Sequence, residues 1–204
     1  MKEFWDERYG LNEFVYGETP NLFFKEVIDN YSPKGNILLP AEGEGRNAVY
    51  AAKNSLNVTC FDLSEQGKLK ALKLAQAQNV TINYLVGNVS EMNFKTASFD
   101  VLAFIYAHFS PNLKEKYYKE LVEKVKPGGL IIFEGFHKNQ LEVNKENETS
   151  FGPQNEAMLF SVDELKSYFF DVEPLYLKEE IIQLNEGNFH KGKGAVIRFI
   201  GKKK

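Results

Sequence analysis

The sequence is poor in cysteine and has no long apolar run. Cys60 is the single cysteine among 204 residues, so no disulfide can form within the chain. It lies in an apolar segment, which indicates a small buried residue in place of a catalytic thiol. No apolar run approaches the length of a membrane span, and the N-terminus MKEFWDERYG lacks the apolar core of a signal peptide. We therefore expect a cytoplasmic protein with no membrane partner.

An excess of charge of either sign is also missing. The formal net charge is −3, with 26% charged and 43% hydrophobic residues, which is ordinary for a globular domain. This balance disfavours a nucleic-acid partner. The three histidines, His108, His137 and His190, are widely spaced, so we predict no metal site. Nothing in the sequence indicates an oligomeric state.

Short apolar runs alternate with amphipathic segments through the middle of the chain. Strands are expected at 37–39, 57–61, 81–86, 99–106 and 130–133, and helices at 46–53, at 65–78 and from Pro111 onward. In the 65–78 helix, Leu69, Leu72 and residues 75–77 are expected on the inner side, and residues 126–129 are expected to form a turn. This alternation predicts an α/β fold with a doubly wound, mostly parallel sheet. Two late strands, 172–183 and 195–200, have a short connection that predicts an antiparallel hairpin.

The stretch from Asn36 to Ala52 reads as a strand, a glycine loop and a helix. Gly43-x-Gly45-x-x-Ala48 satisfies a dinucleotide-binding pattern, and Asp62 follows the next strand, where an acid can bind ribose hydroxyls. On spacing alone, the pattern suits a nicotinamide cofactor at least as well as any other ligand. A tight turn without a ligand, and a helix N-terminal charge at Asp62, remain the structural alternatives.

Several further motifs occur in a fixed order along the chain. They are Trp5-Asp6-x-Arg8-Tyr9, Tyr16-Gly17-x-x-Pro20-Asn21, Gly43-Glu44-Gly45-Arg46-Asn47, Asp62-Leu63-Ser64, Phe99-Asp100-Val101, Ala107-His108-Phe109-x-Pro111, Lys126-Pro127-Gly128-Gly129, Glu134-x-Phe136 and Glu186-Gly187-x-x-His190-x-Gly192. In their order and spacing the chain resembles class I S-adenosylmethionine-dependent methyltransferases, and within them the tellurite-resistance and thiopurine methyltransferase branch.

The resemblance implies a Rossmann-like fold with a seven-stranded sheet and S-adenosyl-L-methionine as the cofactor. It implies a single domain, 1–204, with an N-terminal helical cap (1–35), a cofactor-binding core (36–136), a substrate-side loop (137–160) and a C-terminal helix and hairpin (161–204). Gly43 and Gly45 would approach the methionine part, Asp62 the ribose, and Asn88 and Val89 the adenine. The remaining residues expected at the cofactor are Tyr16, Gly17, Arg46, Leu63 and Tyr106.

The candidates for catalysis and substrate binding follow the later strands and the N-terminal cap. Tyr106 and His108 are the catalytic candidates, and His108 is the first choice for a base or a substrate contact. The substrate candidates are Trp5, Arg8, His108, Glu134, Phe136 and His190. Each has a structural alternative: a satisfied strand-end histidine for His108, a turn-stabilising role for His190, an ion pair with a lysine for Glu134, a surface salt bridge for Arg8, and a place in the core for the aromatic residues.

We therefore expect in-line methyl transfer to a small molecule, with thiols and chalcogen oxyanions among the acceptors. Three positions depart from the family pattern: Leu39 replaces the usual acid, Ala41 the usual first glycine and Asn88 the frequent aspartate on the adenine side. Loss of the acid at position 39 should weaken cofactor binding unless Glu42 or Glu44 substitutes for it. These departures keep a non-catalytic nucleotide-binding homologue open. A nicotinamide-dependent oxidoreductase is the other alternative.

Overall fold

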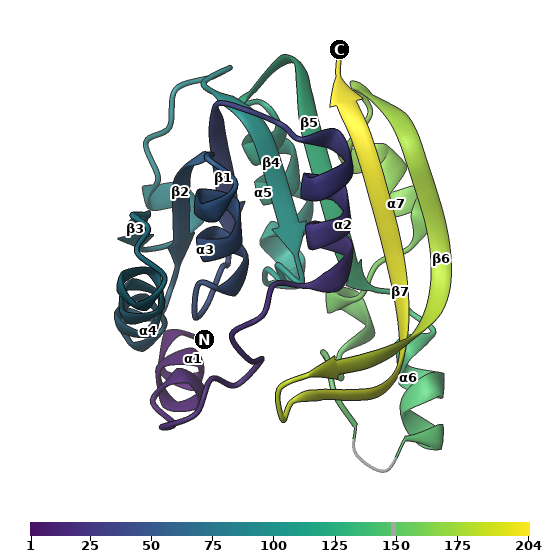
Figure 1. Ribbon diagram of the computed structural model, residues 1–204. Helices are drawn as coiled ribbons and strands as arrows, with labels where there is room; N and C mark the ends of the chain where they lie inside the picture. Colours follow the sequence, from purple (N-terminus) through teal and green to yellow (C-terminus); the bar gives the residue numbers. More distant parts are fainter. Residues whose placement is uncertain (148–149) are drawn as a thin grey trace.

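The centre of the protein is a mixed β-sheet. A computed structural model describes residues 1–147 and 150–204, so Glu148 and Thr149 of the predicted 137–160 loop lie outside the described residues. The sheet has seven strands in the order β3-β2-β1-β4-β5-β7-β6 (Figure 1). The strands are β1 (Asn36–Pro40), β2 (Asn57–Asp62), β3 (Asn83–Val86), β4 (Phe99–Ile105), β5 (Val125–Phe136), β6 (Val172–Glu186) and β7 (His190–Lys203). Strands β1 to β5 pair in parallel and β7 is antiparallel to both its neighbours. The predicted fold class is confirmed.

Helices cover both faces of the sheet. They are α1 (Lys2–Tyr9), α2 (Leu22–Tyr31), α3 (Arg46–Lys53), α4 (Glu65–Ala77), α5 (Pro111–Val122), α6 (Gln140–Val143) and α7 (Val162–Tyr168). Helices α2, α3 and α4 pack on one face, and α5 and α7 on the other (Figure 1). Alternate residues of β1 supply the two cores, Ile37 and Leu39 to one and Leu38 to the other, because successive strand side chains point to opposite faces. None of the helices in the described residues is both long and apolar enough to span a membrane.

The inner face of α4 differs from the prediction. Leu69 and Leu72 are 61% and 39% exposed, so the prediction is wrong for both. Ala75 is buried as predicted, together with Gly67, Ala71 and Leu74. The helix lies against the glycine loop at very short range: a Cβ on Gly67 would be 2.9 Å from the carbonyl oxygen of Gly43. Beside the glycine loop, Gly67 and Ala71 face inward because larger side chains do not fit there.

The predicted turn at residues 126–129 is part of β5. Val125 pairs with Phe99, but the next pair joins Leu130 to Val101, so the intervening residues form an irregularity in the strand. The left-handed φ of +79° at Gly128 gives this irregularity its tight bend.

The terminal hairpin is longer than predicted. Its two strands stay paired up to Glu186 and His190, which leaves three residues, 187–189, in the turn. The long arms curl under the carboxyl ends of β1 and β4 and carry the turn toward the N-terminal segment (Figure 1). There the amide of Asn188 donates to the carbonyl of Val15 at 3.2 Å.

The described part of the predicted 137–160 loop contains local helical structure. It holds α6 and two 3-10 turns, Asn144–Glu146 and Glu156–Met158. Gln140 and Asn144 are buried and hydrogen-bonded to each other at 2.8 Å, and Asn144 Nδ2 also donates to the carbonyl of Phe151. Side-chain amides therefore give this polar segment a defined shape that its composition did not indicate.

Candidate functional site

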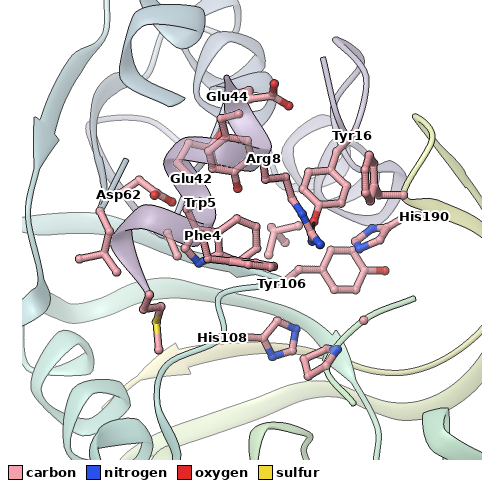
Figure 2. Close-up of a pocket in the computed structure, with 18 of the residues that line it drawn as sticks. Phe4, Trp5, Arg8, Tyr16, Glu42, Glu44, Asp62, Tyr106, His108 and His190 are labelled. Carbon is pink, nitrogen blue, oxygen red and sulfur yellow. Dashed lines mark hydrogen bonds between the residues drawn. The ribbon is translucent and has the colours of Figure 1, made fainter. Parts of the chain in front are cut away.

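A cavity of about 720 Å³ lies beyond the carboxyl ends of β1, β2, β4 and β5. Ligands of open α/β sheets bind at this edge. Most of the residues predicted for the site line the cavity; they are Trp5, Arg8, Tyr16, Gly17, Arg46, Asp62, Leu63, Asn88, Val89, Tyr106, His108, Phe136 and His190. Figure 2 shows several of these side chains, drawn from the N-terminal cap, the strand ends and the hairpin. Residues far apart in the sequence therefore meet in one place.

The glycine loop supports the cavity from behind. Gly43 and Gly45 have left-handed φ angles of +60° and +84°, and neither lines the cavity. A Cβ on Gly43 would be 2.5 Å from the Tyr9 hydroxyl, and one on Gly45 would be 2.5 Å from the Cβ of Ala71. The glycines are needed for backbone conformation and for close packing against α1 and α4. The cavity surface here comes from Ala41, Glu42 and Glu44.

Asp62 is a buried carboxylate at the end of β2. Its two oxygens accept hydrogen bonds from the amides of Gly43 and Ser64, each at 3.0 Å. Burial raises the pKa of Asp62 to about 6, although these amide hydrogen bonds oppose the shift. Each carboxylate oxygen can accept a further hydrogen bond, so Asp62 remains able to bind ligand hydroxyls at the cavity.

Glu42 closes the N-terminus of α3. The N-cap position is Gly45, which has no side chain to offer, and Glu42 Oε1 instead accepts from the amides of Asn47 and Ala48 at 2.8 and 2.7 Å. Burial raises the pKa of Glu42 to about 7, against the effect of these hydrogen bonds. Glu44 accepts from the Val15 amide at 2.8 Å and pairs with Lys70 at 2.8 Å. Both acids line the cavity at the positions where an acid could compensate for Leu39.

His108 presents an unused lone pair. Its Nδ1 lies 3.2 Å from the carbonyl of Met158, so Nδ1 carries the proton and donates. Its Nε2 is buried and has no hydrogen-bond partner among the described residues. Burial lowers the pKa of His108 to about 4, so the ring is neutral at pH 7. The structural alternative, a histidine whose two ring nitrogens are both hydrogen-bonded within the protein, therefore holds for Nδ1 and fails for Nε2.

His190 is held by a carboxylate that the sequence reasoning did not select. Glu186 Oε2 lies 3.1 Å from His190 Nδ1 and 2.9 Å from an Arg46 nitrogen. Although burial opposes ionisation, the hydrogen bond from His190 and the charge of Arg46 hold the pKa of Glu186 at about 2. His190 also lies against the rings of Tyr16 and Tyr106, with centroids 4.5 and 4.8 Å apart. The hairpin motif contained both residues, but its spacing could not show that they form a pair.

Glu134 lies behind the cavity and does not line it. Its side chain is fully buried, Oε2 is 2.5 Å from Arg198 Nε, and Oε1 accepts from Asn21 Nδ2 at 2.6 Å. The predicted ion pair exists, but the partner of this strand-end carboxylate is an arginine and the predicted lysine is wrong. The predicted contact with substrate is not supported by this position.

The N-terminal helix covers the cavity. Asp6 Oδ1 accepts from Ser64 Oγ at 2.6 Å and from the Gln66 amide at 3.3 Å, which attaches α1 to the start of α4. Phe4, which the sequence reasoning missed, lines the cavity beside Trp5 and Arg8 (Figure 2). Phe151, Met158 and Phe189 were missed as well, because no motif marks an aromatic or thioether side chain on a surface segment.

Comparison with known proteins relates this architecture to methyltransferases. A family model described as a methyltransferase domain matches residues 38–133. A protein of Geobacillus sp. (strain WCH70) that is named as a methyltransferase is 27% identical over 184 residues, covering 87% of this chain and 70% of its own. The 2-methyl-6-phytyl-1,4-hydroquinone methyltransferase of Synechocystis sp. is 31% identical over 108 residues, covering 52% of this chain and 33% of that protein. The structure of TehB from Haemophilus influenzae has a TM-score of 0.72 at 17% identity, covering 100% of this chain and 67% of that one.

These matches show a methyltransferase domain and support an enzyme that uses S-adenosylmethionine. The matched segment holds β2 to β4, the glycine loop and most of β1 and β5. The nicotinamide-dependent alternative is not favoured.

Two strand ends at this cavity carry backbone strain. Ala41 and Tyr106 follow β1 and β4, line the cavity, and have left-handed φ angles of +53° and +52°. Such angles are unfavourable for residues with a Cβ, and they tend to occur at functional sites. The usual family glycine at position 41 is thus explained by the backbone, and the alanine adopts the same conformation under strain.

Two substitutions in this loop should change stability in opposite directions. Ala41→Gly relieves about 1 kcal/mol of left-handed strain, less the greater backbone freedom of glycine when unfolded, so we expect slightly higher stability. Gly45→Ala adds left-handed strain and a clash with Ala71, and should lower stability by about 3 kcal/mol. Urea unfolding of both variants measures the difference. Equal losses of stability would show that position 41 is not strained.

Proposed function

We propose that this chain, as one domain spanning 1–204, transfers a methyl group from S-adenosylmethionine to a small-molecule acceptor in the cavity. The observation that carries the proposal is the position of Asp62. This carboxylate lies at the end of β2, is fixed by the Gly43 and Ser64 amides, and faces the cavity. Thiols and chalcogen oxyanions, which the resemblance to the tellurite-resistance and thiopurine branch suggests, remain among the candidate acceptors.

The chemistry of the cavity lining suits this cofactor. Asp62 offers acceptors to the two ribose hydroxyls, and Leu63, Asn88 and Val89 offer an apolar slot with an amide for adenine. Glu42 supplies negative charge for the cationic part of the cofactor. Gly43 and Gly45 act in this proposal as backbone supports, while Ala41, Arg46, Tyr16 and Gly17 form the wall for the methionine part.

The protein's contribution to transfer is alignment and exclusion of water. When bound, the cofactor supplies a methyl group already activated on a sulfonium. The rings of Trp5, Tyr106 and Phe136 wall the cavity, and α1 covers it. The His108 ring is neutral, and its Nε2 has no partner among the described residues. Nε2 can therefore accept a hydrogen bond from an O–H or N–H group of the methyl acceptor.

Binding of the cofactor is the first test. Calorimetry should show binding of S-adenosylmethionine and S-adenosylhomocysteine and none of NAD. Asp62→Asn removes a charged acceptor and should weaken S-adenosylhomocysteine binding roughly 10- to 100-fold, the loss typical of a hydrogen bond to a charged group. Asp100→Asn is the matched control, because Asp100 pairs with Lys126 and does not line the cavity. Binding of NAD without either sulfur compound would refute the proposal.

The affinity for S-adenosylhomocysteine should depend on pH. The pKa of Glu42 is raised to about 7 and that of Asp62 to about 6, so both are partly protonated near neutral pH. Ribose hydroxyls and a cationic amine favour the ionised carboxylates, so binding releases protons and tightens as the pH rises from about 5 to 7. Calorimetry in buffers of different ionisation enthalpy measures the release. An affinity that stays flat or falls over this range would contradict the assigned carboxylates.

A further inference from the structure

The cavity has two chemically different halves. The carboxylates of Glu42, Glu44 and Asp62 lie on one side, toward the ends of β1 and β2 (Figure 2). His108 and His190 lie on the other side, toward β4 and the hairpin. No Asp or Glu of residues 1–147 or 150–204 lines this second half, which we term the aromatic half. The acidic half suits the cofactor, so the aromatic half is left for the acceptor.

The walls of the aromatic half are flat rings. Tyr106 and Phe136 have centroids 4.6 Å apart, and the His108 ring is parallel to that of Phe136 at 5.9 Å, with an angle of 5°. Phe151 and His190 continue the wall at 5.9 Å. Ring faces and edges offer their largest contact area to a planar partner.

Arg8 supplies a positive charge at the roof of the cavity. Its guanidinium carbon lies 4.5 Å from the ring centroid of Phe4 and 4.9 Å from that of Phe189. One nitrogen donates to the Tyr16 hydroxyl at 3.3 Å, and no described carboxylate forms an ion pair with Arg8. The other two arginines of the sequence are both paired, Arg46 with Glu186 and Arg198 with Glu134. The free donors of Arg8 match the two oxygens of a carboxylate.

The unused lone pair of His108 adds a second requirement. Its Nδ1 is committed to the Met158 carbonyl, and this part of the chain is in turn fixed by Lys114, which donates to the Leu159 carbonyl. The Nε2 atom therefore has a fixed position and can accept a hydrogen bond only from a ligand or water. A group that carries an O–H or N–H satisfies it.

We infer that the methyl acceptor is a planar aromatic carboxylate, whose carboxylate binds Arg8 and whose nucleophilic O–H or N–H faces Nε2 of His108. This inference rests on the proposed function. The nucleophilic oxygen or nitrogen forms the new bond to the methyl carbon, its proton passes to His108 Nε2, and the electron pair of the broken carbon–sulfur bond stays on sulfur. His108 then returns the proton to water.

Calorimetry on the full chain saturated with S-adenosylhomocysteine tests recognition without turnover. The probes are the three hydroxybenzoate isomers and the methyl ester of each. At least one acid should bind about tenfold more tightly than its own ester, because the ester cannot form the charge-assisted pair with Arg8. Arg8→Gln should abolish this ratio, and Arg8→Lys should retain part of it. Both should leave S-adenosylhomocysteine affinity within about twofold of the wild type.

Lys2→Gln is the control variant, because it removes a positive charge from the same helix at a residue that pairs with Asp6 outside the cavity. It should leave the acid-to-ester ratio unchanged. The inference is overturned if no acid of the series binds, if the esters bind as tightly as the acids, or if Arg8→Gln weakens S-adenosylhomocysteine tenfold and leaves the ratio intact. The last result would assign Arg8 to the cofactor carboxylate. Failure of S-adenosylhomocysteine itself to bind would refute the proposed function instead.

Discussion

The shape of the cavity depends on buried carboxylates that accept hydrogen bonds from backbone amides. Asp62 accepts from the amides of Gly43 and Ser64, Glu42 accepts from two amides at the start of α3, and Glu44 accepts from the amide of Val15. An ionised carboxylate is costly to bury without such partners, so each loop is constrained to the conformation that supplies them. The glycine loop, the start of α3 and the N-terminal segment are fixed in this way. In these positions, carboxylate oxygens that can accept hydrogen bonds line the acidic half of the cavity.

A second polar network joins the parts of the chain that lie furthest apart in sequence. Asn21 Nδ2 donates to both Glu134 and Glu186, at 2.6 and 3.0 Å. Glu186 in turn binds Arg46 and His190. The N-terminal cap, the first helix after the glycine loop, β5 and the hairpin are thereby connected around the aromatic half. The aromatic half is therefore built partly from both ends of the chain, whereas the carboxylates of the acidic half all lie in the matched segment 38–133.

The parts of the fold that local patterns determine could be predicted from the sequence. The alternation of apolar runs gave the strands and helices, and the position of Asp62 after a strand indicated its place at the sheet edge. The predicted inward position of Leu69 and Leu72 on α4 was wrong. The helix approaches the glycine loop so closely that Gly67 and Ala71 lie there instead. Glu134 could not be assigned from the sequence, since its partners Asn21 and Arg198 are 113 and 64 residues away. The length of the hairpin was likewise hidden, because its outer strand alternates charged and apolar residues irregularly.

A crystal structure with bound S-adenosylhomocysteine would show whether the acidic half of this cavity is the cofactor site. We expect the ribose hydroxyls within hydrogen-bonding distance of Asp62 and the adenine beside Leu63 and Val89. We also expect the sulfur to face Tyr106 and the aromatic half to stay free for a methyl acceptor. A ligand bound outside the cavity, or one whose ribose lies away from Asp62, would contradict it.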